Sequence, residues 1–200
     1  MADEFDSLLG SVRACRLCEP ALPLGARPVL QAAPGALILV AGQAPGSKVH
    51  ASGIPFDDAS GERLRAWMGI GRERFYDPAL VAILPMGFCY PGRGASGDLP
   101  PRAECATTWR EQLLAGLPRI QLTLLLGRYA QDWHLGGDRR SLTARVKDWR
   151  AAWPAMLPLP HPSPRNNRWL RQNAWFEAEV IPALRARIDQ LLPPGPGTRP

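Results

Sequence analysis

The chain has few of the features that mark secreted or membrane proteins. None of its apolar runs reaches the roughly 20 residues that a membrane-spanning helix needs. Its first ten residues, MADEFDSLLG, are acidic and lack the basic start of a secretory signal. No internal repeat is visible. We therefore expect a cytoplasmic protein with no membrane partner, and its 200 residues, 46% of them hydrophobic, suit one domain with a sizeable core.

Lysine is scarce, because only Lys48 and Lys147 are lysines although the formal net charge is +6. Arginine supplies almost all of the positive charge, and a guanidinium group suits bidentate contact with phosphate. A GC-rich genome would also enrich arginine together with proline, glycine and alanine. Charge by itself therefore leaves nucleic-acid binding open.

Cysteine is scarce too, and the four cysteines are arranged unusually. Cys15 and Cys18 form a C-x-x-C near the N-terminus, and Cys89 and Cys105 flank a loop rich in proline and glycine. Four thiolates can hold zinc or an iron–sulfur cluster. In a cytoplasmic protein C-x-x-C more often indicates metal or redox chemistry than a structural disulfide. We predict one shared metal centre, with a redox pair or ordinary thiols as the alternatives.

Four short apolar runs predict buried parallel strands, at 36–41, 80–84, 121–126 and 155–159. Helical patterns separate or follow them, at 62–68, 105–117, 142–149 and 175–192. This alternation predicts an α/β fold, a three-layer α/β/α sandwich with a central four-stranded parallel sheet. We expect a single domain over 1–192 and a disordered tail over 193–200.

Ligands of such sheets bind beyond the carboxyl ends of the strands. A distinctive segment follows each predicted strand: GQAPG at 42–46, then 85–89, 127–129, and HPSP at 161–164. We expect these segments to form a single cleft. The small residues of GQAPG allow backbone N–H groups to approach a ligand, although a tight turn alone would also use them.

Several residues near this edge could carry chemistry. Phe56 could stack on a base or pack in the core. Asp57 and Asp58 could cap the helix that follows, or a carboxylate there could orient a water or stabilise a cationic sugar. His161 could donate to an oxygen that gains negative charge, or bond to backbone. His50 and His134 have no evident partner in the sequence, and we expect both at the surface.

The stretch after His161, residues 165–173, contains three arginines, three asparagines and no acid. That composition suits phosphate contact, and residues 165–169 could fill the gap left by a displaced base. A solvated helix start is the alternative.

Together these segments resemble the uracil-DNA glycosylase superfamily, most closely its iron–sulfur-containing bacterial and archaeal branches, families 4 and 5. The resemblance covers roughly 15–187 and rests on the cysteine framework combined with GQAPG, GIPF and HPSP. It implies a monomeric DNA repair enzyme that flips uracil or a related modified base and hydrolyses its N-glycosidic bond, leaving an abasic site. A non-catalytic nucleic-acid-binding member of the same fold is the alternative.

The resemblance also implies roles for individual residues. Cys15, Cys18, Cys89 and Cys105 would hold a [4Fe–4S] cluster, and His161 would stabilise the departing base. Asp58 matches an aspartate that family 5 uses in place of the acid of the GQAPG loop, and would act on the sugar or on the attacking water, with Asp57 as its alternative. The base pocket would comprise Gly42, Gln43, Ala44, Phe56 and Pro85. The DNA-binding loop would comprise Ser163, Arg165, Asn166, Asn167 and Arg168.

The chain departs from the family pattern at the base pocket. Gln43 stands where family 4 has an acid, and Ala44 stands where the classical enzymes have one. Pro85 occupies the position of the asparagine that reads the uracil edge, and proline has neither a side-chain donor nor an N–H. We therefore expect a broader or different base specificity.

Overall fold

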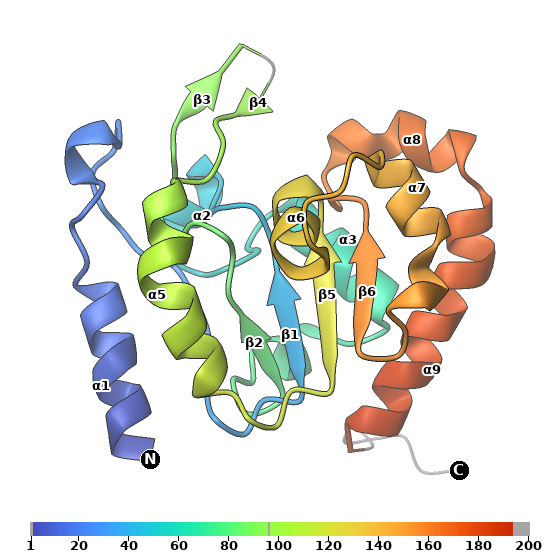
Figure 1. Ribbon diagram of the computed structural model, residues 1–200, viewed down its shortest axis with the longest axis horizontal. Helices are drawn as coiled ribbons and strands as arrows, with labels where there is room; N and C mark the ends of the chain where they lie inside the picture. The colour runs from blue at the N-terminus through green and yellow to red at the C-terminus, as the bar shows by residue number, and fades with distance from the viewer. Residues whose placement is uncertain (1, 96, 194–200) are drawn as a thin grey trace.

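The computed structural model describes residues 2–95 and 97–193, so residues 194–200 of the predicted tail lie outside the described residues. Its centre is a parallel four-stranded sheet with the strand order β2-β1-β5-β6 (Figure 1). The strands are β1 (Ile38–Ala41), β2 (Val81–Ile83), β5 (Leu122–Leu126) and β6 (Met156–Leu159). Each strand lies within one predicted run, and the predicted three-layer α/β/α sandwich is confirmed.

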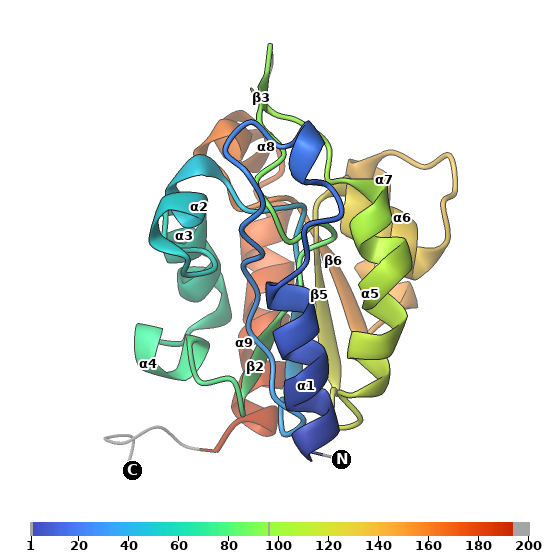
Figure 2. The same cartoon turned by 90° about the vertical axis from the view of Figure 1, so that its left-hand side faces the viewer.

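Both faces of the sheet are buried, which explains why its strands read as continuous apolar runs. Successive side chains of a strand point to opposite faces. Ile38 and Val40 join a core with residues of α3 (Ala59–Met68) and α9 (Ile181–Leu191), whereas Leu39 joins a core with residues of α1 (Ala2–Arg13) and α5 (Ala103–Ala115). Figure 2 shows these two helical layers on either side of the sheet.

Several short helices were not predicted. They are α2 (Ser47–Ser52), α4 (Arg72–Phe75) and α6 (Arg128–Leu135). A fourth short helix, α8 (Asn167–Gln172), lies in the segment for which a helix start was the alternative. The α6 helix corrects one expectation, because Arg128 and Tyr129 were predicted to form a cleft loop. Gly127, with φ of 80°, turns the chain from β5 directly into that helix, and residues 127–129 do not line the large cavity described below.

Two predicted helices are interrupted. The segment 142–149 forms α7 (Leu142–Lys147) and then a 3-10 turn at Trp149–Ala151. The segment 175–192 begins as a π-helical turn over Phe176–Val180, before α9. Pro182 lies in the first turn of α9 and has no N–H to donate to the preceding turn. In the part of the chain that the structure describes, none of the helices is long and apolar enough to cross a membrane.

A two-stranded antiparallel hairpin projects beyond the carboxyl edge of the sheet (Figure 1). It comprises β3 (Arg93–Gly94) and β4 (Gly97–Asp98), with Arg93 opposite Asp98. The loop between Cys89 and Cys105 therefore contains a short regular element, and it stands above the loops that follow the strands.

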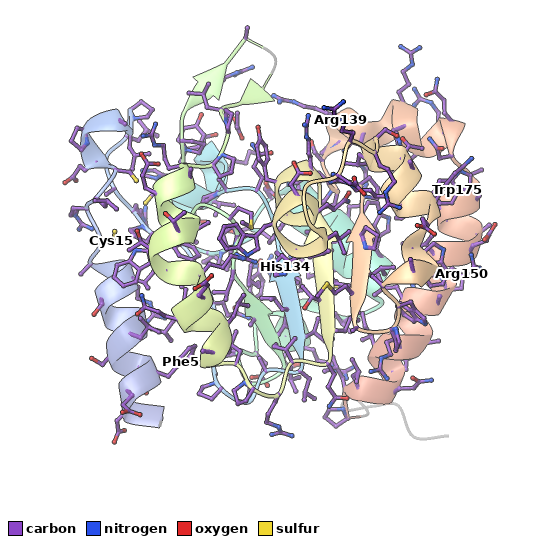
Figure 3. All side chains as sticks on the ribbon, viewed as in Figure 1. Phe5, Cys15, His134, Arg139, Arg150 and Trp175 are labelled. Atoms are coloured by element: carbon purple, nitrogen blue, oxygen red, sulfur yellow. The ribbon has the colours of Figure 1, made fainter. Side chains whose placement is uncertain are left out.

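The expectation that His134 lies at the surface is wrong (Figure 3). Its Nε2 lies 2.8 Å from the guanidinium of Arg110, whose side chain is buried beneath the sheet edge. Arg110 also donates to the carbonyls of Leu84 (3.1 Å) and Pro85 (3.3 Å). Because arginine only donates, His134 accepts through Nε2. Burial, together with the charge of Arg110, lowers the pKa of His134 to about 4.

This buried pair predicts an acid-dependent loss of stability. A histidine in the unfolded chain titrates near pH 6.5. Between pH 6.5 and the folded pKa of about 4, the unfolded state binds more protons, so the free energy of unfolding falls as the pH falls. The contribution is up to about 1.4 kcal/mol per pH unit. In urea unfolding across this range, His134→Gln should flatten the dependence of the unfolding free energy on pH, and an unchanged dependence would contradict the assignment.

Candidate active site

A cavity of about 600 Å³ opens at the carboxyl edge of the sheet. Its walls come from the GQAPG loop, the segment that enters α3, the β3–β4 hairpin and the HPSP segment. The predicted site residues that line it are Gly42, Gln43, Ala44, Phe56, Asp58, Pro85, His161, Ser163, Arg165 and Asn166. Its volume lies within the usual range for small-molecule pockets. The fold thus gathers residues from distant parts of the chain around one space.

The GQAPG loop is fixed by hydrogen bonds to the loop after β2. Met86 N–H donates to the carbonyl of Gly42 at 2.9 Å, and Gly87 N–H donates to that of Gln43 at 3.0 Å. The Gln43 side chain donates through Nε2 to the carbonyl of Leu99, at 3.0 Å, just after β4. The amide of Gln43 is therefore committed to the hairpin, and this residue can serve a ligand mainly through its backbone.

Phe56 is held in an unusual backbone conformation. Its φ is 55°, a region that residues with a bulky side chain rarely adopt. Its carbonyl accepts from the hydroxyl of Tyr76 (3.2 Å) and from Arg65 (3.4 Å). A Cβ at Gly61 would collide with this carbonyl, so only glycine fits there. The half-buried ring packs edge-on to Phe75 and also lines the cavity, so both predicted roles apply to it.

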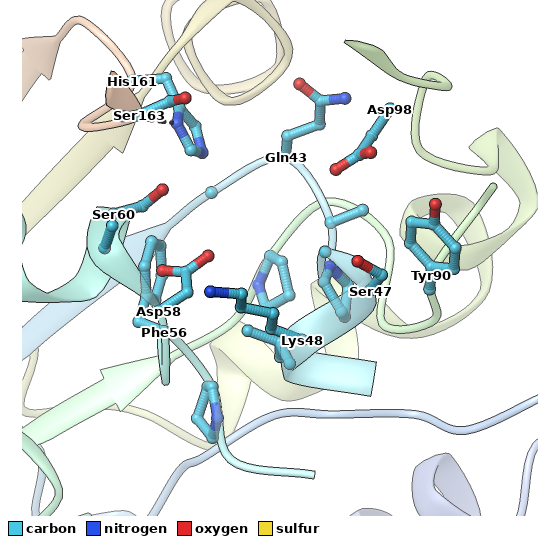
Figure 4. A pocket seen from close by; sticks show the side chains of 18 of the residues that line it. Gln43, Ser47, Lys48, Phe56, Asp58, Ser60, Tyr90, Asp98, His161 and Ser163 are labelled. Carbon is cyan, nitrogen blue, oxygen red and sulfur yellow. Dashed lines mark hydrogen bonds between the residues drawn. The ribbon is translucent and has the colours of Figure 1, made fainter. Parts of the chain in front are cut away.

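Asp58 caps α3 and also reaches the cavity. Its Oδ1 accepts from Gly61 N–H at 2.9 Å, which satisfies one free donor of the first turn. Figure 4 shows its carboxylate facing the cavity, with the amine of Lys48 directed toward it. Asp57 instead accepts from Arg72 at 3.2 Å and does not line this cavity. Of the two neighbouring carboxylates, Asp58 is the one placed to act on a ligand.

His161 presents a hydrogen-bond donor to the cavity. Ser163 N–H donates to its Nδ1 at 3.2 Å, so a neutral ring carries its proton on Nε2. Asn166 holds the backbone by donating to the His161 carbonyl at 2.7 Å. Burial lowers the pKa of His161, against smaller opposing effects of Asp58 and Asp98. The imidazole is therefore neutral near pH 7 and offers Nε2–H.

The segment after His161 is docked on α3. Arg63 donates to the carbonyl of Ser163 (3.0 Å) and to the side chain of Asn167 (2.7 Å). Arg168 is exposed on α8. Trp169 departs from the expectation that 165–169 fills the gap of a displaced base, because this half-buried side chain packs on the main core and donates through Nε1 to Thr143 at 2.8 Å.

The cavity also contains residues that sequence reasoning missed. Ser47 and Lys48 enter from α2, Tyr90 from the loop after β2, and Asp98 from the hairpin (Figure 4). Arg93 of the hairpin also lines the cavity. Lys48 is one of only two lysines and follows the GQAPG loop closely in the sequence, which could have marked it as a residue of the cavity. Nothing in the local sequence distinguished Asp98 from a loop aspartate, because only the fold places it over the GQAPG loop.

The four cysteines line a second, small cavity between the N-terminal segment, the loop after β2 and the start of α5 (Cys15 in Figure 3). No histidine or carboxylate is among the described residues that line it. Phe88 N–H donates to the sulfur of Cys105 at 3.3 Å, and burial raises the pKa of Cys105 to about 12. Within residues 2–95 and 97–193, no three His, Cys, Asp or Glu side chains are grouped so as to hold a metal ion.

The family model of the uracil DNA glycosylase superfamily matches residues 31–185. The matched range contains GQAPG, the entry to α3, the hairpin and HPSP, whereas Cys15 and Cys18 precede it. Members of this superfamily act on DNA, and membership indicates a DNA glycosylase in general. The match spans most of the chain and agrees with the observed three-layer fold and with the placement of the cavity, so the chain belongs to the uracil DNA glycosylase superfamily.

Proposed function

We propose that this protein extrudes a damaged base from duplex DNA and hydrolyses its N-glycosidic bond, leaving an abasic site. The supporting observation is the cavity that places the neutral imidazole of His161, the carboxylate of Asp58 and the ring of Phe56 around one space. A duplex hides its glycosidic bonds, so the target nucleotide must leave the stack to reach such a cavity.

Each of these groups suits one part of the reaction. Cleavage of the bond leaves an electron pair on the base and positive charge on the sugar. Nε2–H of His161 would donate to the base oxygen that gains charge, which is worth roughly 3–4 kcal/mol for a donor of this kind. The carboxylate of Asp58 would stabilise the sugar, and the ring of Phe56 would stack on the base, for about 1–3 kcal/mol.

The floor of the cavity supports a base preference other than strict uracil reading. Pro85 offers neither a side-chain amide nor an N–H, and its carbonyl already accepts from Arg110 at 3.3 Å. We propose that the enzyme accepts uracil among other deaminated or modified bases.

A screen of duplexes tests the proposed function directly. Duplexes containing uracil, hypoxanthine, xanthine or ethenocytosine are incubated with the protein and scored for abasic sites. Excision of at least one base is the expected result. DNA binding without excision of any of these bases would favour the non-catalytic alternative. The observation that supports this alternative is the absence of an acid at Gln43 and Ala44.

The surface of α8 should contribute to DNA affinity. Arg168 is exposed there, and reversing its charge with Arg168→Glu should weaken binding to all sequences. The slope of log affinity against log salt should fall by about 1 if one phosphate contact is lost. Arg119→Glu, an equal charge change between α5 and β5 at the opposite edge of the sheet, is the matched control. Equal effects of the two variants would show that α8 has no specific contact with DNA.

We also propose that the chain is of the iron–sulfur type of families 4 and 5, with one [4Fe–4S] cluster. The donor set supports it, because all four thiols line one cavity without histidine or carboxylate. The N–H of Phe88 already bonds to the Cys105 sulfur, as outer hydrogen bonds of metal ligands commonly do. Such a cluster would supply a structural cross-link, in which Cys15 and Cys18 hold the N-terminal segment against the start of α5.

A further inference from the structure

Asp98 is a carboxylate of the cavity that the proposed function does not use. It lies on β4 and lines the cavity, and Figure 4 shows its carboxylate facing the GQAPG loop. A Cβ placed on Gly46 would lie 3.6 Å from Asp98 Oδ2, so the carboxylate stands directly over the end of that loop. Its carboxylate has no hydrogen bond or ion pair with any of the residues the structure describes.

The hairpin that carries Asp98 is fixed on both sides. Gln43 donates to the carbonyl of Leu99, the residue after Asp98, at 3.0 Å. Leu99 N–H in turn donates to the carbonyl of Gly92 at 2.8 Å. The guanidinium of Arg165 lies directly against the hairpin, because a Cβ added to Gly97 would meet its Nη1. Asp98 is therefore held between the GQAPG loop and the segment that follows His161.

Asp98 lies within electrostatic reach of the imidazole. The charges of Asp58 and Asp98 both raise the pKa of His161 and oppose the larger effect of burial. The two carboxylates differ in their hydrogen bonds. Asp58 Oδ1 accepts from Gly61 N–H at the start of α3, whereas the Asp98 carboxylate has no such partner among the described residues. Asp98 thus keeps both carboxylate oxygens available to a water in the cavity.

We propose that Asp98 is a catalytic residue that accepts the proton of the attacking water, replacing the acid that the GQAPG loop lacks. This inference rests on the proposed function. The water oxygen forms a bond to C1′ of the sugar while the bond from C1′ to the base nitrogen breaks. The electron pair of that bond goes to the base, whose oxygen His161 holds, and the water proton goes to Asp98 and then to solvent.

The test is single-turnover excision of the base identified by the duplex screen. Asp98→Asn keeps the shape but removes the charge, and should slow excision by about 10²-fold, as loss of a general base does. Affinity for the same duplex and the melting temperature should stay at wild-type values. Asp98→Glu, which keeps a carboxylate, should recover part of the rate. Asp189→Asn, an exposed aspartate change on α9, is the control for charge alone.

A double-mutant cycle that combines Gln43→Ala with Asp98→Asn distinguishes a catalytic role of Asp98 from a merely structural one. Gln43→Ala releases the hairpin and should slow excision in the wild type, but have little further effect in Asp98→Asn, because both changes remove the same carboxylate from its place. Wild-type excision by Asp98→Asn, with slow excision by Asp58→Asn, would overturn the inference and leave the proposed function standing. Absence of excision by the wild-type protein from every duplex would overturn both.

Discussion

Replacing His161 with alanine should slow base excision by about 10²–10³-fold, the effect of removing one donor from an oxyanion site. The departing base gains negative charge, and His161 presents its Nε2–H to the cavity as a neutral donor. Single-turnover rates on the duplex found by the screen measure the effect. Binding of the same duplex should change far less, because the interaction strengthens only as charge develops.

Two comparisons make this result specific. His161→Gln retains an N–H donor and should keep more of the rate than His161→Ala. His50→Gln alters a histidine of α2 that does not line the cavity, and should excise at the wild-type rate. If His161→Ala excised at the wild-type rate while folded, the imidazole would be a structural group that only bonds to Ser163 and the stabilisation of the base would come from elsewhere.

If the proposed [4Fe–4S] cluster is present, replacing any one of the four cysteines should abolish it and strongly destabilise the protein. A cross-link that closes a long loop contributes about 4 kcal/mol in the chain-entropy treatment of disulfides, and a cluster joining Cys15 and Cys18 to Cys89 and Cys105 closes a loop of that kind. Iron and sulfide analysis of anaerobically purified protein, together with melting temperatures, measures both effects. The four alanine variants should behave alike.

The alternatives for the cysteines give different outcomes. Stoichiometric zinc without iron in the purified protein would contradict the cluster and identify a zinc site. A loss of stability confined to Cys105→Ala, whose sulfur accepts from Phe88, would indicate ordinary packed thiols. A redox pair would be indicated if only Cys15→Ala and Cys18→Ala changed the thiol reactivity.

The sequence determined the layered fold on its own. The runs around Ile38, Val81, Leu122 and Met156 are almost entirely apolar, as the strands of a parallel sheet buried on both faces are, and helical patterns lie between them. Boundaries were less well predicted because single residues set them. Gly127 turns the chain straight into α6, and Asp58 starts α3 three residues before its predicted first turn.

The cavity was only partly readable from the sequence. GQAPG, Phe56 and His161 follow or flank the strands in a familiar pattern, so their meeting at one edge was predictable. The positions of Asp98 and Lys48 were not predictable. Asp98 lies on a hairpin of two-residue strands and Lys48 on a six-residue helix, and contacts such as that of Gln43 with Leu99 hold such short elements in place. Local patterns carry no information about such contacts.

The same distinction applies to the charged groups of the interior. By its sequence alone His134 is an ordinary polar residue of an arginine-rich chain, and only the family resemblance favours Asp58 over its neighbour Asp57. The tertiary structure packs the half-buried His134 against the buried Arg110, and directs Asp58 to the cavity and Asp57 to Arg72. The sequence by itself determined which residue types were present and which faces were apolar. Tertiary packing decided which polar groups face the cavity, because burial and the choice of partner are set by residues distant in the chain.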